Sequence, residues 1–238
     1  MRVLSVVHHR NAAAGVFREP ARVAGHELVE WLPHEGPPPS PEGLDAAIVF
    51  GAEAQVDQEE TLPWLRHEKE LVRLLLERDV PMLGVCFGSQ VLAEAAGAVV
   101  RPAERAEIGW NEVELTPEGL SDPVLGFLPE RFEAFGYHHY EWLLPPGGVP
   151  LARSAACLQA FRLGEGPFWG IQFHPEVTLE DLSSWLANWK TDPGAVATGL
   201  DPEAIRAESA EKIGGWNDVG RGISARFLAA AAGTLLER

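Results

Sequence analysis

Cys86 lies within the segment GVCFG at residues 84–88, which has the pattern Gly-x-Cys-x-Gly. An apolar segment typical of a buried strand ends there, at residues 81–85, and a helical pattern follows at 89–96. This setting is typical of a nucleophile elbow, in which small flanking residues relieve the crowding around a strained nucleophile. A thiol at a helix N-terminus is favoured as the thiolate, and the amide of Phe87 can donate to an oxyanion. The pattern predicts a cysteine nucleophile; the alternative is a structural cysteine between two glycines.

A base for this nucleophile is offered by the segment QFHPE at residues 172–176. A strand-like apolar segment ends at His174, and Pro175 directs the chain out of the sheet. Glu176 follows two residues after the histidine, where it can accept a hydrogen bond from the imidazole and fix its tautomer. An isolated His-Pro-Glu is more typical of an exposed loop. Together with the elbow, it predicts a catalytic triad of Cys86, His174 and Glu176.

The second cysteine, Cys157, lies among small residues without flanking glycines, and we interpret it as a core or packing residue. Two cysteines exclude both a disulfide framework and a four-cysteine zinc site. His138 and His139 have no His or Asp partners at ligand spacing, so we expect neither a metal nor any other cofactor. Three further histidines are interpreted as structural or exposed: His8, His9 and His26.

The first half of the chain alternates short apolar segments with helical patterns. Strands are expected at residues 3–7, 27–31, 46–50 and 81–85, and helices at 12–24, 63–78 and 89–96. Continuous apolar strands that alternate with helices are typical of a parallel sheet covered on both faces.

The second half begins with a region rich in strands. Strand-like segments are expected at residues 108–115, 131–135, 151–154, 158–162 and 168–173. An amphipathic helix is expected at 179–190, and two further helices at 202–236. The predicted fold class is α/β, with a mostly parallel central sheet flanked by helices and additional antiparallel strands. We expect residues 1–238 to form a single domain with a C-terminal helical segment at about 201–238.

The composition excludes several classes of protein. The 238 residues include 19 Lys and Arg against 35 Asp and Glu, which gives a formal net charge of −16. Nucleic-acid binding usually requires a basic surface, and an anionic membrane disfavours an acidic protein. The N-terminal apolar segment is too short for a secretory signal, and no apolar run is long enough to span a membrane. We predict a cytoplasmic protein that acts on a small molecule.

The motifs GVCFGSQ at 84–90 and GIQFHPE at 170–176, in this order, resemble those of the class I (triad) glutamine amidotransferases. EIGW at 107–110 and YHHY at 137–140 support the resemblance, which covers most of residues 1–190. The region is most similar to free-standing members related to the glutaminase part of GMP synthase. The resemblance implies a flavodoxin-like amidotransferase fold. Because the remaining residues predict only helices, we expect no synthetase domain after it.

The resemblance implies a specific reaction. Cys86 would attack the side-chain carboxamide of glutamine, while His174 takes the thiol proton and then protonates the departing ammonia. Glu176 would hold His174, and water would hydrolyse the resulting thioester to glutamate.

Substrate-binding positions also follow from the resemblance. The oxyanion would be met by the amide of Phe87 and by a glycine loop that corresponds to Gly51 here. This family commonly has two glycines in that loop, whereas this chain has one, followed by Ala52. Gln90 corresponds to a position that contacts the substrate, and His138 to one that lines the glutamine pocket.

Three functions are compatible with these residues. The first is a glutaminase or amidotransferase that passes ammonia to a synthase partner, which the sequence does not identify. The second is a γ-glutamyl peptidase or hydrolase that acts on a substituted γ-glutamyl amide. The third is a non-catalytic binding or regulatory module, supported only by the altered glycine loop. Glutamine carries no net charge, so the acidic balance of the protein neither steers nor repels it strongly.

Overall fold

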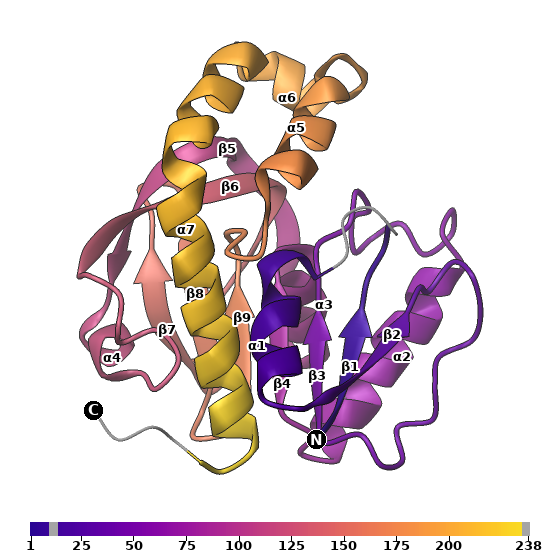
Figure 1. Ribbon diagram of the computed structural model, residues 1–238. Helices are drawn as coiled ribbons and strands as arrows, with labels where there is room; N and C mark the ends of the chain where they lie inside the picture. Colours follow the sequence, from indigo (N-terminus) through magenta and orange to yellow (C-terminus); the bar gives the residue numbers. More distant parts are fainter. Residues whose placement is uncertain (10–13, 235–238) are drawn as a thin grey trace.

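A computed structural model describes residues 1–9 and 14–234 of the chain. The strands are β1 (Arg2–Val6), β2 (Glu27–Trp31), β3 (Ala46–Val49), β4 (Met82–Val85), β5 (Val100–Leu115), β6 (Arg131–Trp142), β7 (Gly148–Arg153), β8 (Leu158–Leu163) and β9 (Phe168–Ile171). They form one nine-stranded sheet in the order β2-β1-β3-β4-β9-β8-β7-β5-β6 (Figure 1). Neighbours from β2 to β9 run parallel, and those from β9 to β6 run antiparallel. The predicted α/β class is confirmed.

Helices cover both faces of the parallel half of the sheet. The helices of the described residues are α1 (Arg18–Val23), α2 (Trp64–Glu77), α3 (Phe87–Ala95), α4 (Pro117–Ser121), α5 (Leu179–Ala187), α6 (Pro193–Ala197) and α7 (Pro202–Ala231), of which α4 packs on the antiparallel strands. Figure 1 shows α1 and α7 on one face, with α2 and α3 behind the sheet. Two apolar cores follow from this layering: one includes Phe17 and Phe227, and the other includes Leu65 and Val91.

The helices that precede and follow β4 begin close to where the sequence predicts them. Helix α2 spans Trp64–Glu77 and buries an apolar stripe that includes Leu65, Leu71 and Leu75. Helix α3 starts at Phe87, directly after Cys86 and two residues before its predicted start. The turn between β4 and α3 is therefore as short as a nucleophile elbow requires.

Strands β5 and β6 extend well beyond the predicted segments. They pair along most of their length, from Val100 opposite Trp142 to Glu114 opposite Arg131. Residues 100–106 are mostly exposed, so they lack the apolar alternation that marks a half-buried strand. Residues 100–102 pair with β6 rather than being buried, and an irregularity shifts the register between Pro102 and Glu107.

The prediction of two helices at residues 202–236 is wrong, because α7 is a single helix of 30 residues. Gly214 and Gly215 lie in its middle, where each glycine costs about 1 kcal/mol relative to alanine. Ile213 and Trp216 on either side are buried against the domain, and this packing keeps the helix continuous. Residues 235 and 236 of the predicted range lie outside the described residues.

Two other predicted helices are shorter than expected. In the range 12–24, residues 12 and 13 lie outside the described residues, Gly15–Phe17 form a 3-10 turn, and α1 follows. In the range 179–190, α5 ends at Ala187 and a second 3-10 turn follows at Trp189–Thr191. None of the helices in the described ranges is long and apolar enough to cross a membrane.

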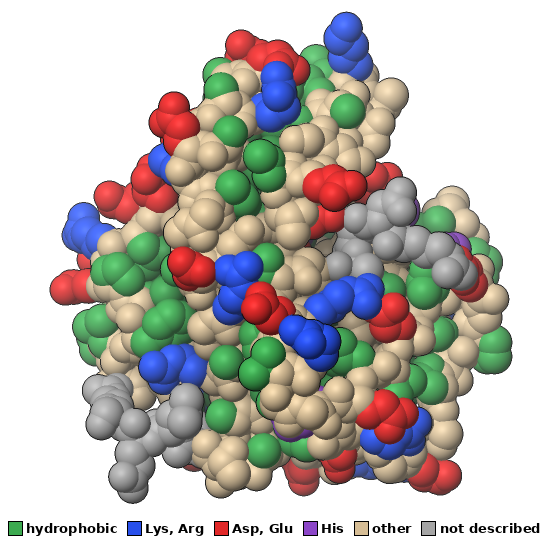
Figure 2. All heavy atoms as spheres, viewed as in Figure 1, with side chains coloured by type: hydrophobic (Ala, Val, Ile, Leu, Met, Phe, Trp, Pro, Cys, Tyr) green, Lys and Arg blue, Asp and Glu red, His purple; other side chains and the backbone are tan. Residues whose placement is uncertain are grey.

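Charged side chains of both signs are interspersed on the face that carries α1 and α7 (Figure 2). An ion pair joins the two helices there, with Arg221 Nε of α7 at 2.6 Å from Glu19 Oε2 of α1. Exposed pairs of this kind contribute up to about 1 kcal/mol. The position of α7 therefore depends mainly on its buried residues.

Candidate active site

Cys86 occupies a sharp turn between β4 and α3. Its backbone has φ 51° and ψ −111°, in a region that residues with a side chain rarely adopt. A Cβ atom at Gly84 would overlap the backbone of Gly88, and one at Gly88 would overlap the carbonyl of Val49. Both flanking positions therefore require glycine, as the sequence pattern indicates.

The sheet brings the two motifs together. Strands β4 and β9 are parallel neighbours, with Val85 opposite Ile171. The residues that follow them, Cys86 and Gln172, consequently emerge at the same edge. The Gln172 side-chain amide approaches the Cys86 sulfur at 3.6 Å.

His174 is buried and held from several directions. Its Nδ1 lies 2.8 Å from Glu176 Oε1, and its backbone N–H donates to the carbonyl of Phe135 at 2.8 Å. The indole N–H of Trp216, from α7, donates to the His174 carbonyl at 2.8 Å. The ring of Trp185, from α5, packs against the imidazole with centroids 4.8 Å apart. The orientation of the imidazole is therefore set by both neighbouring and distant parts of the chain.

The electrostatics of this histidine favour its protonated form. Burial acts to lower the pKa of His174, but the negative charges of Cys86 and Glu176 and hydrogen bonds to both outweigh it. The pKa of His174 is consequently raised well above its ordinary value. A protonated imidazole beside a cysteine sulfur is the state that stabilises a thiolate nucleophile.

Cys86 and His174 line a cavity of about 560 Å³. The loop after β3 forms one side of it, and residues 137–139 of β6 form another. The segment from α5 to α6 closes a third side with Trp185, Asn188, Thr191, Asp192 and Pro193. Asp192 is fixed there, because its Oδ2 accepts hydrogen bonds from Tyr137 at 3.0 Å and from His139 at 2.8 Å.

The loop after β3 contacts the catalytic candidates closely. A Cβ atom at Gly51 would lie 2.9 Å from His174 Cε1 and 3.6 Å from Cys86 Cβ, so only glycine fits without displacing the imidazole. Ala52 is not among the residues with positive φ, so its backbone does not require glycine. The second glycine that the resemblance leads one to expect is therefore not needed for the conformation of this loop.

Comparison with known proteins identifies the family of the chain. The sequence model of the family described as glutamine amidotransferase class-I matches residues 41–190. The chain belongs to the class I glutamine amidotransferase family. A solved glutamine amidotransferase from Thermotoga maritima superposes with a TM-score of 0.82 at 25% identity, over 97% of each chain.

Curated relatives of this amidotransferase-family chain include GMP synthases and a γ-glutamyl amide hydrolase. The glutamine-hydrolyzing GMP synthase of Thermomicrobium roseum is 35% identical over 182 residues, 74% of this chain and 32% of that protein. A γ-glutamyl-L-1-hydroxyisopropylamide hydrolase from a Pseudomonas species is 31% identical over 150 residues, 60% of this chain and 50% of that protein. The chain thus spans about a third and a half of their respective lengths. A separate glutamine-hydrolyzing GMP synthase subunit of Ignicoccus hospitalis is 34% identical, over 67% of this chain and 81% of that subunit.

The residues predicted as functional in this family member come together in the structure. Most of them line the cavity: Gly51, Cys86, Phe87, Gln90, His138 and His174. Glu176 lies behind His174, bonded to its ring. The Gln90 side-chain nitrogen donates to the carbonyl of Tyr140 and to the Gln172 side chain, both at 3.3 Å.

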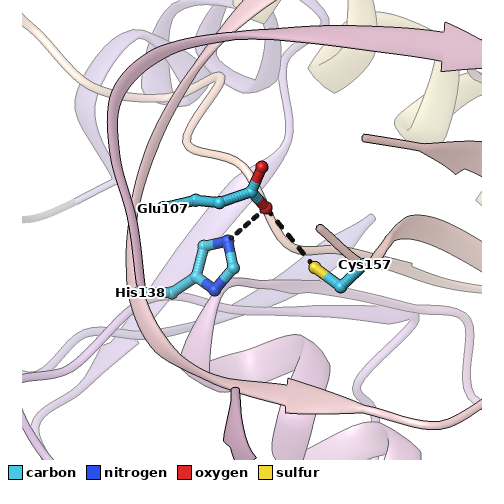
Figure 3. A group of neighbouring side chains, drawn as sticks. All are labelled: Glu107, His138 and Cys157. Carbon is cyan, nitrogen blue, oxygen red and sulfur yellow. Dashed lines mark hydrogen bonds and ion pairs between the residues drawn. The ribbon is translucent and has the colours of Figure 1, made fainter. Parts of the chain in front are cut away.

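His138 belongs to a second cluster, with Glu107 and Cys157 (Figure 3). Its Nε2 lies 3.3 Å from Glu107 Oε2, and the Cys157 thiol donates to the same oxygen at 3.4 Å. Of the two predicted roles for Cys157, core or packing, the structure shows a half-buried residue that packs against polar groups. Burial and the Glu107 charge raise the pKa of its thiol, and the Gln159 amide donates to Glu107 Oε2 at 2.6 Å. Contacts to Glu107 Oε2 hold the three residues of this cluster together. A thiol that stays protonated is a poor metal ligand.

Several residues of the site carry no signal in the sequence. Gln172 lies inside the motif GIQFHPE, but the motif assigns it no role, and Trp185 and Asp192 lie in a segment whose pattern indicates only helix and loop. The apolar pattern around Trp216 indicates only a packing residue; this tryptophan is buried, and it also bonds the His174 carbonyl. Only the packing of α5 and α7 at the sheet edge reveals these contacts.

Proposed function

We propose that this chain hydrolyses the γ-carboxamide of glutamine, or of a γ-glutamyl amide, through a thioester on Cys86. The observation that carries the proposal is the arrangement of three buried side chains: Glu176 bonds His174, and His174 and Cys86 line the same cavity. The raised pKa of His174 and the names of the relatives support it.

The reaction follows from the chemistry of these groups. The Cys86 thiolate attacks the amide carbon, and the carbonyl oxygen becomes an oxyanion that the amides of Gly51 and Phe87 stabilise. Protonated His174 gives its proton to the nitrogen, the C–N bond breaks, and ammonia or an amine leaves. Water, deprotonated by His174, then attacks the thioester; the C–S bond breaks, which frees glutamate and restores the thiolate beside the protonated imidazole. Glu176 stabilises the imidazolium throughout.

A substituted γ-glutamyl amide is the second candidate substrate. The cavity of about 560 Å³ lies within the range that holds drug-sized ligands, and residues of the α5–α6 segment line one side of it. The similarity to the Pseudomonas γ-glutamyl amide hydrolase also favours it. Alternatively, this chain would supply ammonia to a synthase on another chain, and its similarity to a glutamine-hydrolyzing GMP synthase subunit of Ignicoccus favours this.

Glutamate release from purified protein tests the proposal. Glutamine, γ-glutamyl isopropylamide and γ-glutamyl p-nitroanilide are supplied separately, and glutamate is measured with a coupled dehydrogenase. We expect release from at least one of them, and a loss of at least about a hundredfold in Cys86→Ser. Cys157→Ser is the matched control and should keep the wild-type rate. Equal inactivity of wild type and Cys86→Ser on all three would instead favour a non-catalytic module.

A further inference from the structure

His8, which follows β1, is buried beside the candidate active site. The sequence predicts a structural or exposed histidine; the residue is 5% exposed, and its partner Glu68, from α2, is fully buried. His8 Nε2 lies 2.9 Å from Glu68 Oε2, and His8 Nδ1 lies 3.0 Å from the carbonyl oxygen of Gly51. Because a carbonyl only accepts hydrogen bonds, Nδ1 is the donor in the second contact.

The imidazole of His8 contacts both residues whose amides face the proposed oxyanion. Besides bonding Gly51, its ring packs edge-on against Phe87, with centroids 5.3 Å apart and planes at 83°. Trp64 of α2 packs on it as well, at 5.4 Å. His8 therefore supports the loop after β3 and does not line the cavity that holds Cys86.

Gly51 needs an external anchor. The residue before it is tied to the sheet, because the Phe50 N–H donates to the carbonyl of Val6 at 3.1 Å. Beyond that bond the chain leaves the strand, and a glycine has a wide choice of backbone angles. Among the described residues, no acceptor binds the Gly51 amide. The bond from His8 to the Gly51 carbonyl fixes the peptide unit that follows Gly51, so the Gly51 amide lies between two anchored peptide units.

We propose that His8, held by Glu68, is a positioning residue that directs the Gly51 amide towards the oxyanion; this inference rests on the proposed function. A donor contributes to catalysis only when it is preorganised at the place where the charge develops, and loss of one such donor lowers kcat about 10²- to 10³-fold. Glu68 sets the ring plane of His8 in the way that a carboxylate orients a catalytic or metal-bound imidazole. Neither His8 nor Glu68 lines the cavity that holds Cys86.

Three substitutions of His8 distinguish its bond to Gly51 from its bond to Glu68. His8→Asn keeps a donor near the position of Nδ1, so it can still bond Gly51. His8→Gln places its amide near the position of Nε2, so it can bond Glu68 but not Gly51. His8→Leu can do neither. His8→Asn and His8→Leu both leave Glu68 buried without its partner; if they fail to fold for that reason, the comparison of wild type with His8→Gln, which keeps the bond to Glu68, still decides.

Two chemical readouts distinguish positioning from a general loss of structure. We expect kcat to fall at least tenfold in His8→Gln and His8→Leu at unchanged KM, and to stay within threefold of wild type in His8→Asn. Binding of glutamate γ-semialdehyde, which forms a tetrahedral adduct with a thiol, should weaken in parallel with kcat. Alkylation of Cys86 by iodoacetamide develops no oxyanion, so its rate should stay unchanged in all three variants.

The amide signal of Gly51 provides a test that does not depend on turnover. In ¹⁵N-labelled protein, we expect the Gly51 resonance to shift and its hydrogen exchange to accelerate in His8→Gln but not in His8→Asn. Identical Gly51 signals in wild type and His8→Gln would overturn the inference, as would a parallel loss of alkylation and kcat. If wild type is inactive on every γ-glutamyl amide, the proposed function fails, while the Gly51 signal still judges whether His8 positions this residue.

Discussion

Substitution of Gly51 by alanine should disable the site while leaving the fold in place. Its new Cβ would lie 2.9 Å from His174 Cε1, whereas carbon atoms in contact are separated by about 3.5–4.0 Å. The imidazole must therefore move by roughly 0.5–1 Å, and a displacement of about 1 Å costs about a hundredfold in rate. We expect kcat/KM to fall about 10- to 100-fold, which corresponds to about 1.4–2.7 kcal/mol.

The assay is glutamate release, together with the rate of Cys86 alkylation and the free energy of unfolding in urea. Because the φ angle of Gly51 is not positive, the alanine strains no backbone, and the loss of stability should stay below about 3 kcal/mol. Ala52→Gly is the matched control, since Ala52 does not need the freedom of glycine, and we expect less than a threefold change in rate. Full activity of Gly51→Ala would refute the inferred crowding between this loop and His174.

Three other perturbations test the surroundings of His174. Glu176→Gln should lower kcat by about 10³- to 10⁴-fold, because the amide no longer stabilises the imidazolium; a loss below tenfold would contradict this. In Cys86→Ser, which removes the thiolate charge, the pKa of His174 should fall relative to wild type, as measured by NMR titration of the ring; an unchanged or higher pKa would show that the sulfur does not raise it. Trp216→Phe deletes the hydrogen bond to the His174 carbonyl and should lower the free energy of unfolding by about 1 kcal/mol and kcat severalfold; wild-type values for both would exclude α7 as a support of the site.

The local features of the site could be predicted from the sequence because they depend on residues a few positions apart. The turn at Cys86 brings neighbouring backbone segments so close that the positions two before and two after it must be glycine. The sequence shows this pattern at residues 84–88. Pro175 ends a strand at His174 and places Glu176 within reach of the imidazole by the same local logic.

Long-range features depended on the order of the strands. The sequence does not state that β9 lies beside β4, and this pairing alone brings Gln172 to the Cys86 sulfur. The same holds for His8, whose role follows from its contacts with Gly51 and Glu68, residues that lie 43 and 60 positions away along the chain. The residues 202–231 likewise form one helix because Ile213 and Trp216 are buried against the domain, which outweighs the helix-breaking tendency of two adjacent glycines.

The sequence by itself therefore determined the candidate nucleophile, its base and the α/β class, since steric requirements and apolar periodicity act over short stretches of chain. Only the tertiary structure decided which side chains surround them: the tryptophans that hold His174, the α5–α6 wall of the cavity, and the buried histidine behind Gly51. The physical reason is that these contacts come from burial and hydrogen bonding between elements whose proximity is set by sheet order, and no local pattern encodes that order.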